Sequence, residues 1–191
     1  MVRRIAVIFA ITLGVGANIS ADTVRVYGGD FNISILDKSW AEDAVINIPE
    51  HRIISDLDAE ISITHTNVFD LQIFLVNPAN TSRICLNKYD GFFKGANYTQ
   101  TVFDDEADVP IEQGVPPFTG RFRPVEPFKL SAFDGQDAFG QWRLQVYDAY
   151  YADTGTLNNF QITIANPEPV TVMFLALGVC LMHLRRPRPA F

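Results

Sequence analysis

The sequence predicts a single all-β domain over residues 22–166, folded as a jelly-roll β-sandwich of about eight strands. Apolar residues in this stretch recur with a period of two rather than 3.6. Turn-forming residues interrupt the apolar runs at short intervals, and no run has the pattern of a long amphipathic helix. The hydrophobic content of the chain, 48%, is enough to build a buried core.

The strands follow from alternation along the chain. Between Leu57 and His65 apolar and polar side chains alternate, as in a strand with one face toward water. Residues 71–76 carry apolar side chains at both parities, with Phe74 and Val76 opposite the others, so we expect that strand to be buried on both sides. Further strands are expected at 24–27, 45–48, 82–86, 142–146 and 160–164.

Turns are expected where glycine, proline, asparagine and aspartate gather. These places are Gly28-Gly29-Asp30, 77–80, Asp90-Gly91, Asp134-Gly135 and 153–155. Residues 104–130 hold five prolines and show no alternation. We expect them to form a long ordered connection across the end of the sandwich, and long connections of this kind are often functional.

The N-terminal residues 1–21 have the three regions of a secretory signal peptide, in order. Arg3 and Arg4 are followed by an apolar run over residues 5–15 and then by small residues up to Ala21. Signal peptidase is therefore expected to cleave near Ala21, which would place the middle domain outside the cytoplasm.

The C-terminal residues 167–191 also have three parts. Pro167-Glu168-Pro169 precedes an apolar run over residues 170–184, which is short for a membrane-spanning helix, and Arg185 and Arg186 follow it. This arrangement resembles a PEP-CTERM sorting signal. The resemblance implies a bacterial envelope protein that is held in the inner membrane during export and then processed by an exosortase. An ordinary tail anchor is the alternative.

Charge separates the middle domain from the two ends. Residues 22–166 hold 10 Lys and Arg against 21 Asp and Glu, so the net charge is 10 − 21 = −11. This balance argues against nucleic acid as a partner and is compatible with a hard cation such as Ca²⁺. The two cysteines, Cys85 and Cys180, cannot form a disulfide framework, and a bridge between them is not expected because Cys180 lies in the C-terminal segment.

Six blocks of the middle domain occur in the order of a known family. They are 61–66 with 70–73, 75–78 with 80–81, 103–107, 117–120 with 122–124, 140–144, and 153–157. Over roughly residues 45–165 the chain resembles the P domain, or P/Homo B domain, which follows the subtilisin-like catalytic domain in proprotein convertases. Asn80 stands where the family usually has glycine, and Phe160 where tryptophan is common. The resemblance implies an eight-stranded jelly roll similar to galactose-binding folds.

Catalytic residues are not expected. The chain has no Gly-x-Ser-x-Gly elbow and no serine, histidine and acid in the setting of a catalytic triad. We expect His65, at the inward end of its strand, to fix the following turn through a hydrogen bond. The resemblance implies the same, because the P domain itself carries no catalytic residues.

The acidic block Asp104, Asp105 and Glu106 is the candidate metal site, with Ca²⁺ as the ion, because adjacent carboxylates in a loop are calcium ligands. Three aspartates at strand ends could supply further ligands: Asp70, Asp148 and Asp153. The alternative is a solvated or turn-capping acidic run that Arg121 and Arg123 neutralise across the loop.

The tyrosines Tyr147, Tyr150 and Tyr151 cluster near a predicted loop and could stack on a sugar, or could equally be packing residues. The expected function is that of an exported, non-catalytic P-domain protein of the bacterial cell envelope that binds protein or carbohydrate at the cell surface. One alternative is an accessory or remnant of a subtilisin-like serine endopeptidase. Another is a calcium-dependent carbohydrate-binding module of the extracellular matrix.

Overall fold

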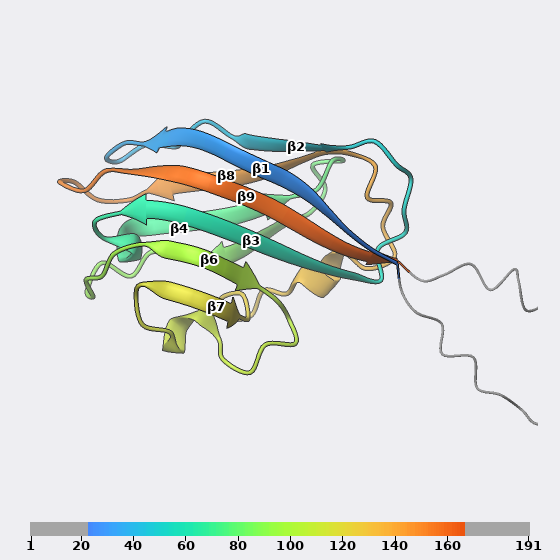
Figure 1. The fold of residues 1–191 in the computed structure, drawn as a ribbon. Coiled ribbons are helices and arrows are strands. Elements are labelled where there is room, and N and C mark those ends of the chain that lie inside the picture. The colour runs from blue at the N-terminus through green and yellow to red at the C-terminus, as the bar shows by residue number, and fades with distance from the viewer. Residues whose placement is uncertain (1–22, 167–191) are drawn as a thin grey trace, which may run out of the picture.

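The structure is a computed structural model that describes residues 23–166. These residues form two β-sheets stacked face to face (Figure 1). The strands are β1 (Thr23–Ile35), β2 (Ala44–Ile48), β3 (Asp56–His65), β4 (Leu71–Val76), β5 (Arg83–Asn87), β6 (Tyr98–Phe103), β7 (Phe118–Phe122), β8 (Gly140–Asp148) and β9 (Gly155–Asn166). Three short 3-10 helices lie at 68–70, 111–113 and 130–133. The all-β prediction is confirmed, with nine strands in the described residues rather than about eight.

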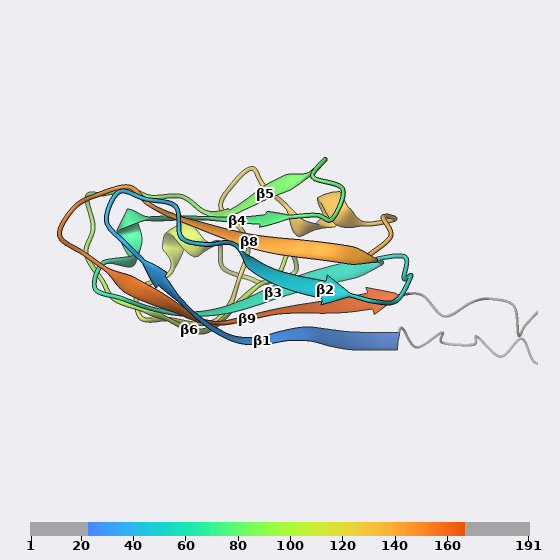
Figure 2. The same cartoon turned by 90° about the horizontal axis from the view of Figure 1, so that it is seen from above.

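The larger sheet has the order β1-β9-β3-β6-β7, and the smaller has the order β2-β8-β4-β5. Neighbouring strands are antiparallel except β6 and β7, which are parallel. Figure 2, seen from above, shows the two sheets as separate layers. Sequential strands often lie in different sheets, so the chain crosses the sandwich repeatedly.

The core lies between the two sheets and comes from the apolar parity of each strand. In β3, the side chains of Leu57, Ala59, Ile61 and Ile63 are buried, while the intervening polar residues face outward. Trp142 on β8 is fully buried, and its indole N–H donates to the Ala138 carbonyl at 2.8 Å. The alternation found in the sequence therefore predicts these inner faces correctly.

The described segment is closed on itself. β1 and β9 are neighbours along most of their length, and the Thr23 hydroxyl donates to the Asn166 side chain, so both ends of the segment leave from one end of the sandwich (Figure 1). Among the described residues, one hydrophobic core lies between the two sheets. The segment thus contains what a domain needs to fold without the rest of the chain.

The predicted turn at Gly28-Gly29-Asp30 is wrong, because these residues lie inside β1. Gly28 has a φ of +128°, and a Cβ there would come within 2.2 Å of the Phe160 carbonyl oxygen on β9. Glycine is needed because the two strands approach closely, not because the chain reverses. β1 is consequently much longer than the strand expected at 24–27.

The predicted connection over residues 104–130 is also corrected. It contains β7, and β6 before it was not foreseen. β7 is a short edge strand with exposed residues at Thr119, Gly120 and Arg121, so it lacks the alternation of a strand that packs on the core. The strand β4 was expected to be buried on both faces. Val76 is buried as expected, but Phe74 is only half-buried.

Residues 23–166 include no helix of the length and apolarity that a bilayer crossing requires. The predicted signal peptide, 1–21, and the predicted sorting segment with its short membrane helix, 167–191, lie outside the described residues.

Candidate functional site

An aromatic and cationic cluster lies on the outer face of the smaller sheet. We call it the aromatic face and define it as Trp40, Phe74, Arg83 and Tyr147. The Trp40 ring lies 4.9 Å from the Tyr147 ring and 6.1 Å from the Phe74 ring, centroid to centroid. The Arg83 guanidinium lies 3.6 Å from the Phe74 centroid and 5.1 Å from the Trp40 centroid. Trp40 keeps 51% of its surface exposed.

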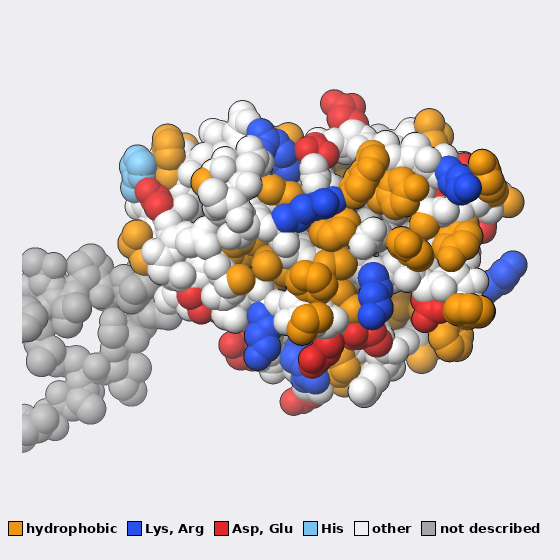
Figure 3. All heavy atoms as spheres, turned by 180° about the vertical axis from the view of Figure 1, so that it is seen from behind, with side chains coloured by type: hydrophobic (Ala, Val, Ile, Leu, Met, Phe, Trp, Pro, Cys, Tyr) orange, Lys and Arg blue, Asp and Glu red, His pale blue; other side chains and the backbone are white. Residues whose placement is uncertain are grey.

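Strand parity places these side chains. On β8 the residues Trp142, Leu144 and Val146 point into the core, so Tyr147 points outward, and Phe74 does the same on β4. Trp40 joins the sheet through an isolated bridge to Tyr147. Figure 3 looks onto this side of the molecule and shows hydrophobic side chains interleaved with Lys and Arg. Such a face can contact a partner through aromatic stacking and cation–π interactions.

Sequence reasoning did not identify Trp40 or Arg83 as functional candidates. Phe74 was assigned to a buried second face because apolar residues at both parities normally mean burial. The alternation along the two strands could have predicted that Phe74 and Tyr147 point outward. Which residues they contact could not be predicted, because that depends on the order of β8, β4 and β5 in the sheet.

The three candidate sugar-stacking tyrosines contact different partners. Tyr147 packs on Trp40 in the aromatic face. Tyr150 meets the Tyr89 ring edge-on at 5.9 Å, and Tyr151 lies under the Lys38 ammonium at 4.5 Å. These contacts give no single platform shared by all three rings.

The acidic block is held by intramolecular hydrogen bonds. Asp104 accepts from Arg121 Nε at 2.6 Å and from the Glu106 backbone N–H at 2.7 Å. Arg121 also donates to Asp58 at 2.7 Å. Burial by itself raises the pKa of Asp104, but the hydrogen bonds from Arg121 and Glu106 outweigh it and lower that pKa below its ordinary value.

Asp105 caps the short helix that follows the proline-rich stretch. Its two carboxylate oxygens accept the backbone N–H groups of Leu130 and Ser131 at 2.9 and 2.8 Å. Arg123 donates to the backbone carbonyls of Ala107 and Asp108 rather than to a carboxylate. The geometry supports the turn-capping alternative, with Arg121 as the neutralising cation.

No group of three or more His, Cys, Asp or Glu side chains within residues 23–166 is placed to hold a metal ion. Asp70 and Asp148 lie with His65, whereas the acidic block lies near Asp58. His65 and Asp58 are seven residues apart on β3, which is about 23 Å along a strand. The strand-end aspartates therefore do not complete a site with the block, and calcium binding stays a prediction.

His65 belongs to a buried polar network at the end of β3. Its Nε2 lies 3.1 Å from Asp148 Oδ2, and its Nδ1 accepts the Asn67 backbone N–H at 3.2 Å. The Asn67 side chain donates to Asp70 at 2.9 Å. Burial raises the pKa of both Asp70 and Asp148. As predicted, His65 fixes the turn after its strand through a hydrogen bond.

A second histidine lies at the other end of the sandwich. His51 Nδ1 is 2.6 Å from Asp137 Oδ2, and its ring stacks on Phe139 at 4.2 Å. Asp137, Phe139 and Arg143 help line a surface hollow of about 570 Å³ beside them. No local pattern in the sequence indicates this pair, because its members are 86 residues apart.

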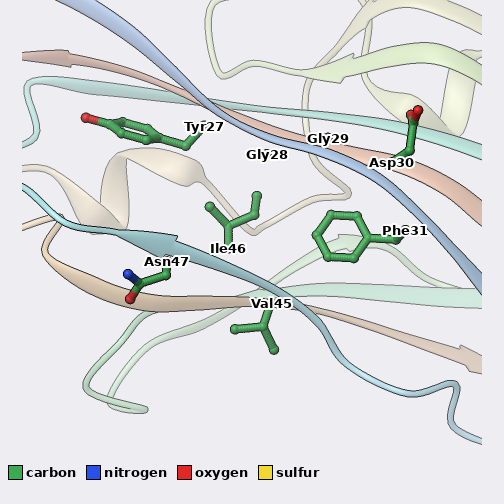
Figure 4. Close-up of a pocket in the computed structure, with 8 residues that line it drawn as sticks. All are labelled: Tyr27, Gly28, Gly29, Asp30, Phe31, Val45, Ile46 and Asn47. Carbon is green, nitrogen blue, oxygen red and sulfur yellow. The ribbon is translucent and has the colours of Figure 1, made fainter.

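A smaller hollow of about 340 Å³ separates the edge strands β1 and β2. Figure 4 shows Tyr27 and Phe31 from β1 on one side and Val45 and Ile46 from β2 on the other, with Asp30 turned away from them. Asp30 accepts a hydrogen bond from the Asn159 side chain at 2.9 Å. The hollow is the open edge of the sandwich and holds no catalytic group.

Comparison with known proteins gives one family match. A family model described as the proprotein convertase P-domain matches residues 54–164. No curated protein matches the chain.

Two solved structures of a serine protease from Aeromonas sobria are similar to the chain. In the complex of that protease with the chaperone ORF2, the identity is 17%, the match covers 77% of this chain and 28% of the other, and the TM-score is 0.48. In the structure of the protease itself, the identity is 17%, the coverage is 75% and 27%, and the TM-score is 0.46. This chain thus spans less than a third of the length of the protease chains.

Proposed function

The chain belongs to the proprotein convertase P-domain family, and we propose that it acts as a non-catalytic binding or structural module exported to the bacterial cell envelope. The observation that carries the proposal is the family match, which accounts for most of the sandwich. His65 supports it, because this histidine is completely buried and hydrogen-bonds to Asp148 and to the Asn67 backbone.

The aromatic face is the proposed binding surface, and a protein is the proposed partner. Trp40 is half exposed although it packs on Tyr147 and Phe74, so further aromatic area is free for a contact. Trp, Tyr and Arg are the residues that most often dominate protein interfaces. Carbohydrate binding draws less support, because the three candidate tyrosines do not share one platform.

The second candidate is an accessory of a separately encoded subtilisin-like serine endopeptidase. The P domain is a non-catalytic accessory domain of such proteases, and this chain belongs to the same family. On this candidate, the aromatic face would pack against the catalytic domain of another chain.

Export is part of the proposal. Residues 1–21 would be removed by signal peptidase, and residues 167–191 would hold the protein in the inner membrane until an exosortase cleaves near Pro167-Glu168-Pro169. The intact mass of protein isolated from the envelope tests this. If the mature protein retains Arg185 and Arg186, residues 167–191 are an ordinary membrane anchor and not a sorting signal.

Site-specific crosslinking tests the binding surface. A p-benzoylphenylalanine replacing Trp40 in the native envelope is expected to capture a protein, and Arg83→Glu is expected to abolish the capture. The matched control places the crosslinker at Gln161, on the outer face of the larger sheet. Equal capture from both positions would contradict the proposal. A captured subtilisin-like protease would favour the second candidate.

Catalysis is tested separately. Purified residues 22–166 are expected not to react with a fluorophosphonate probe and not to cleave peptides. Covalent labelling of a serine would overturn the non-catalytic assignment.

A further inference from the structure

Three loops meet at the end of the sandwich opposite Thr23 and Asn166. We call them the loop tip and define it as residues 36–40, 88–97 and 149–154. The Lys38 N–H donates to the Tyr150 carbonyl at 3.2 Å, which joins the first loop to the third. Tyr150 packs so closely on Gly91 that a Cβ at position 91 would lie 2.5 Å from its hydroxyl oxygen. The loops therefore form one contiguous surface.

The loop tip exposes large apolar side chains. Phe92 is 91% exposed, Tyr151 is 69% exposed and Phe93 is 61% exposed. The Phe93 ring rests on Phe69 at 5.6 Å, so the loop base is packed while Phe92 projects beyond it. Tyr89 and Tyr150 are also exposed beside them. Figure 3 shows hydrophobic and Lys or Arg side chains together at the end away from the grey termini.

The loops that carry the exposed aromatics also carry lysines, one of which, Lys38, lies over the Tyr151 ring, and the acids of the same loops accept hydrogen bonds. Three lysines belong to the loop tip: Lys38, Lys88 and Lys94. The carboxylates of Asp37 and Asp90 accept the backbone N–H groups of Ala152 and Phe92, and Asp153 accepts the Thr66 hydroxyl. Formal charge here is 3 − 3 = 0, whereas the whole of residues 22–166 carries −11.

The acidic block is far from this surface. Asp58 and Asp104 lie toward the other end of β3, about 23 Å from His65 and the turn beside the loop tip. That separation exceeds two Debye lengths at physiological ionic strength. An anionic surface that approached the loop tip would therefore meet the exposed lysines and be screened from the acidic block, while Asp70 and Asp148 beside the tip are buried.

We propose that the loop tip docks on the interface of a phospholipid bilayer. Phe92 and Phe93 insert among the acyl chains, the tyrosines lie at the level of the headgroups, and the lysines extend to the phosphates. The surface projects, and the two hollows noted in the sandwich are lined by other residues. A projecting aromatic surface with a lysine rim fits a bilayer better than it fits the groove of a protein partner.

Vesicle sedimentation tests the docking with residues 23–166, which contain the whole core. The segment is expected to bind vesicles of phosphatidylcholine with 30% phosphatidylglycerol. Phe92→Ser with Phe93→Ser is expected to weaken partitioning at least ten-fold, since each buried phenylalanine contributes about that factor or more. Replacing the three lysines by glutamine should weaken binding to these vesicles and leave binding to pure phosphatidylcholine unchanged.

A tryptophan probe locates the contact. Both probes are placed in a Trp40→Phe background, because Trp40 is half exposed within the loop tip. There Phe92→Trp is expected to be quenched by brominated lipid, and the control Phe139→Trp, an exposed ring at the other end of the sandwich, is expected not to be. Near-ultraviolet circular dichroism verifies that each variant is folded. Absence of vesicle binding, or binding that the double serine variant retains, would overturn the proposal. So would concentration-dependent self-association that this variant abolishes in the absence of lipid, because the surface would then join two copies of the chain.

Discussion

His65 Nε2 lies 3.1 Å from Asp148 Oδ2, and both side chains are completely buried. The two residues are 83 positions apart, and they meet because β3 and β8 end at the same end of the sandwich. The other ring nitrogen, Nδ1, lies 3.0 Å from the Asn67 carbonyl oxygen and 3.2 Å from the Asn67 amide nitrogen, so both sides of the ring are held. The pair ties the larger sheet to the smaller one where the loops begin.

Removal of one member of this pair is expected to be costly. Asp148→Ala should lower the free energy of unfolding by about 3–5 kcal/mol, because it leaves a buried polar partner unsatisfied. Asp148→Asn should cost less, since an amide oxygen can still accept from His65. The control is Asp137→Ala in the exposed pair with His51, with an expected loss of about 1 kcal/mol or less. Urea denaturation measures all three, and equal losses at both pairs would contradict the assignment.

The Asp104–Arg121 contact predicts a dependence of stability on pH. The pKa of Asp104 is lowered in the folded state, so its stabilisation is present above the unfolded value of 3.8 and is lost as pH falls through the folded pKa. Asp104→Asn should therefore cost about 1 kcal/mol at pH 7, a modest figure because Arg121 is half exposed. The difference from the parent should shrink as the pH falls below 3.8 and through the folded pKa of Asp104. If the loss of stability in Asp104→Asn were the same at every pH, it would come from the changed shape of the side chain and not from its charge.

The predicted calcium site at Asp104, Asp105 and Glu106 is tested by the melting temperature, and the partners that these carboxylates already have argue against a large rise. Arg121 already neutralises Asp104, and the oxygens of Asp105 are taken by backbone N–H groups. Calcium at a hundredfold excess over the dissociation constant of a site would add about 2.7 kcal/mol to the free energy of unfolding. For a domain of this size the melting temperature would rise by about 5–10 °C. Melting in calcium and in chelator decides the matter. A rise that Glu106→Gln reduces and Asp30→Asn preserves would establish the calcium site.

Gly28 and Gly29 are expected to respond very differently to alanine. At Gly28 the new Cβ would collide with the Phe160 carbonyl, and φ is +128°, so we expect a loss of at least about 2 kcal/mol. At Gly29 nothing lies within 4 Å of the new Cβ, so the change should be nearly neutral. Denaturation of the two variants tests whether β1 runs through this dipeptide, since a flexible turn would tolerate both.

Cys85 is expected to be inert toward thiol reagents in the folded protein. It is buried, and burial raises the pKa of its thiol to about 11, so almost no thiolate exists at pH 8. With Cys180 replaced by serine, Ellman's reagent should label Cys85 only after denaturant is added. Rapid labelling without denaturant would show that β5, an edge strand, opens readily.

Local sequence accounts for most of the fold. Period-two alternation predicted β3, β8 and β9 because each buries one face on the core, and the turn expected at 77–80 exists, with Asn80 at a φ of +55° as the family departure from glycine allows. The alternation did not predict β7, because this exposed edge strand does not bury alternate residues. The sequence also predicted a turn at Gly28-Gly29, because two strands that approach closely need glycine just as a turn does.

The sequence by itself determined that the chain is a β-sandwich with the blocks of a P domain, because burial of one strand face and the order of motifs are written along the chain. Only the tertiary structure decided how the side chains are used. Arg121 neutralises Asp104 and Asp58, which are 17 and 63 positions away, and Trp40 packs on Tyr147 through the isolated bridge that joins these two residues. Which cation meets which carboxylate depends on the order and register of the strands, and those are set by the packing of the whole core.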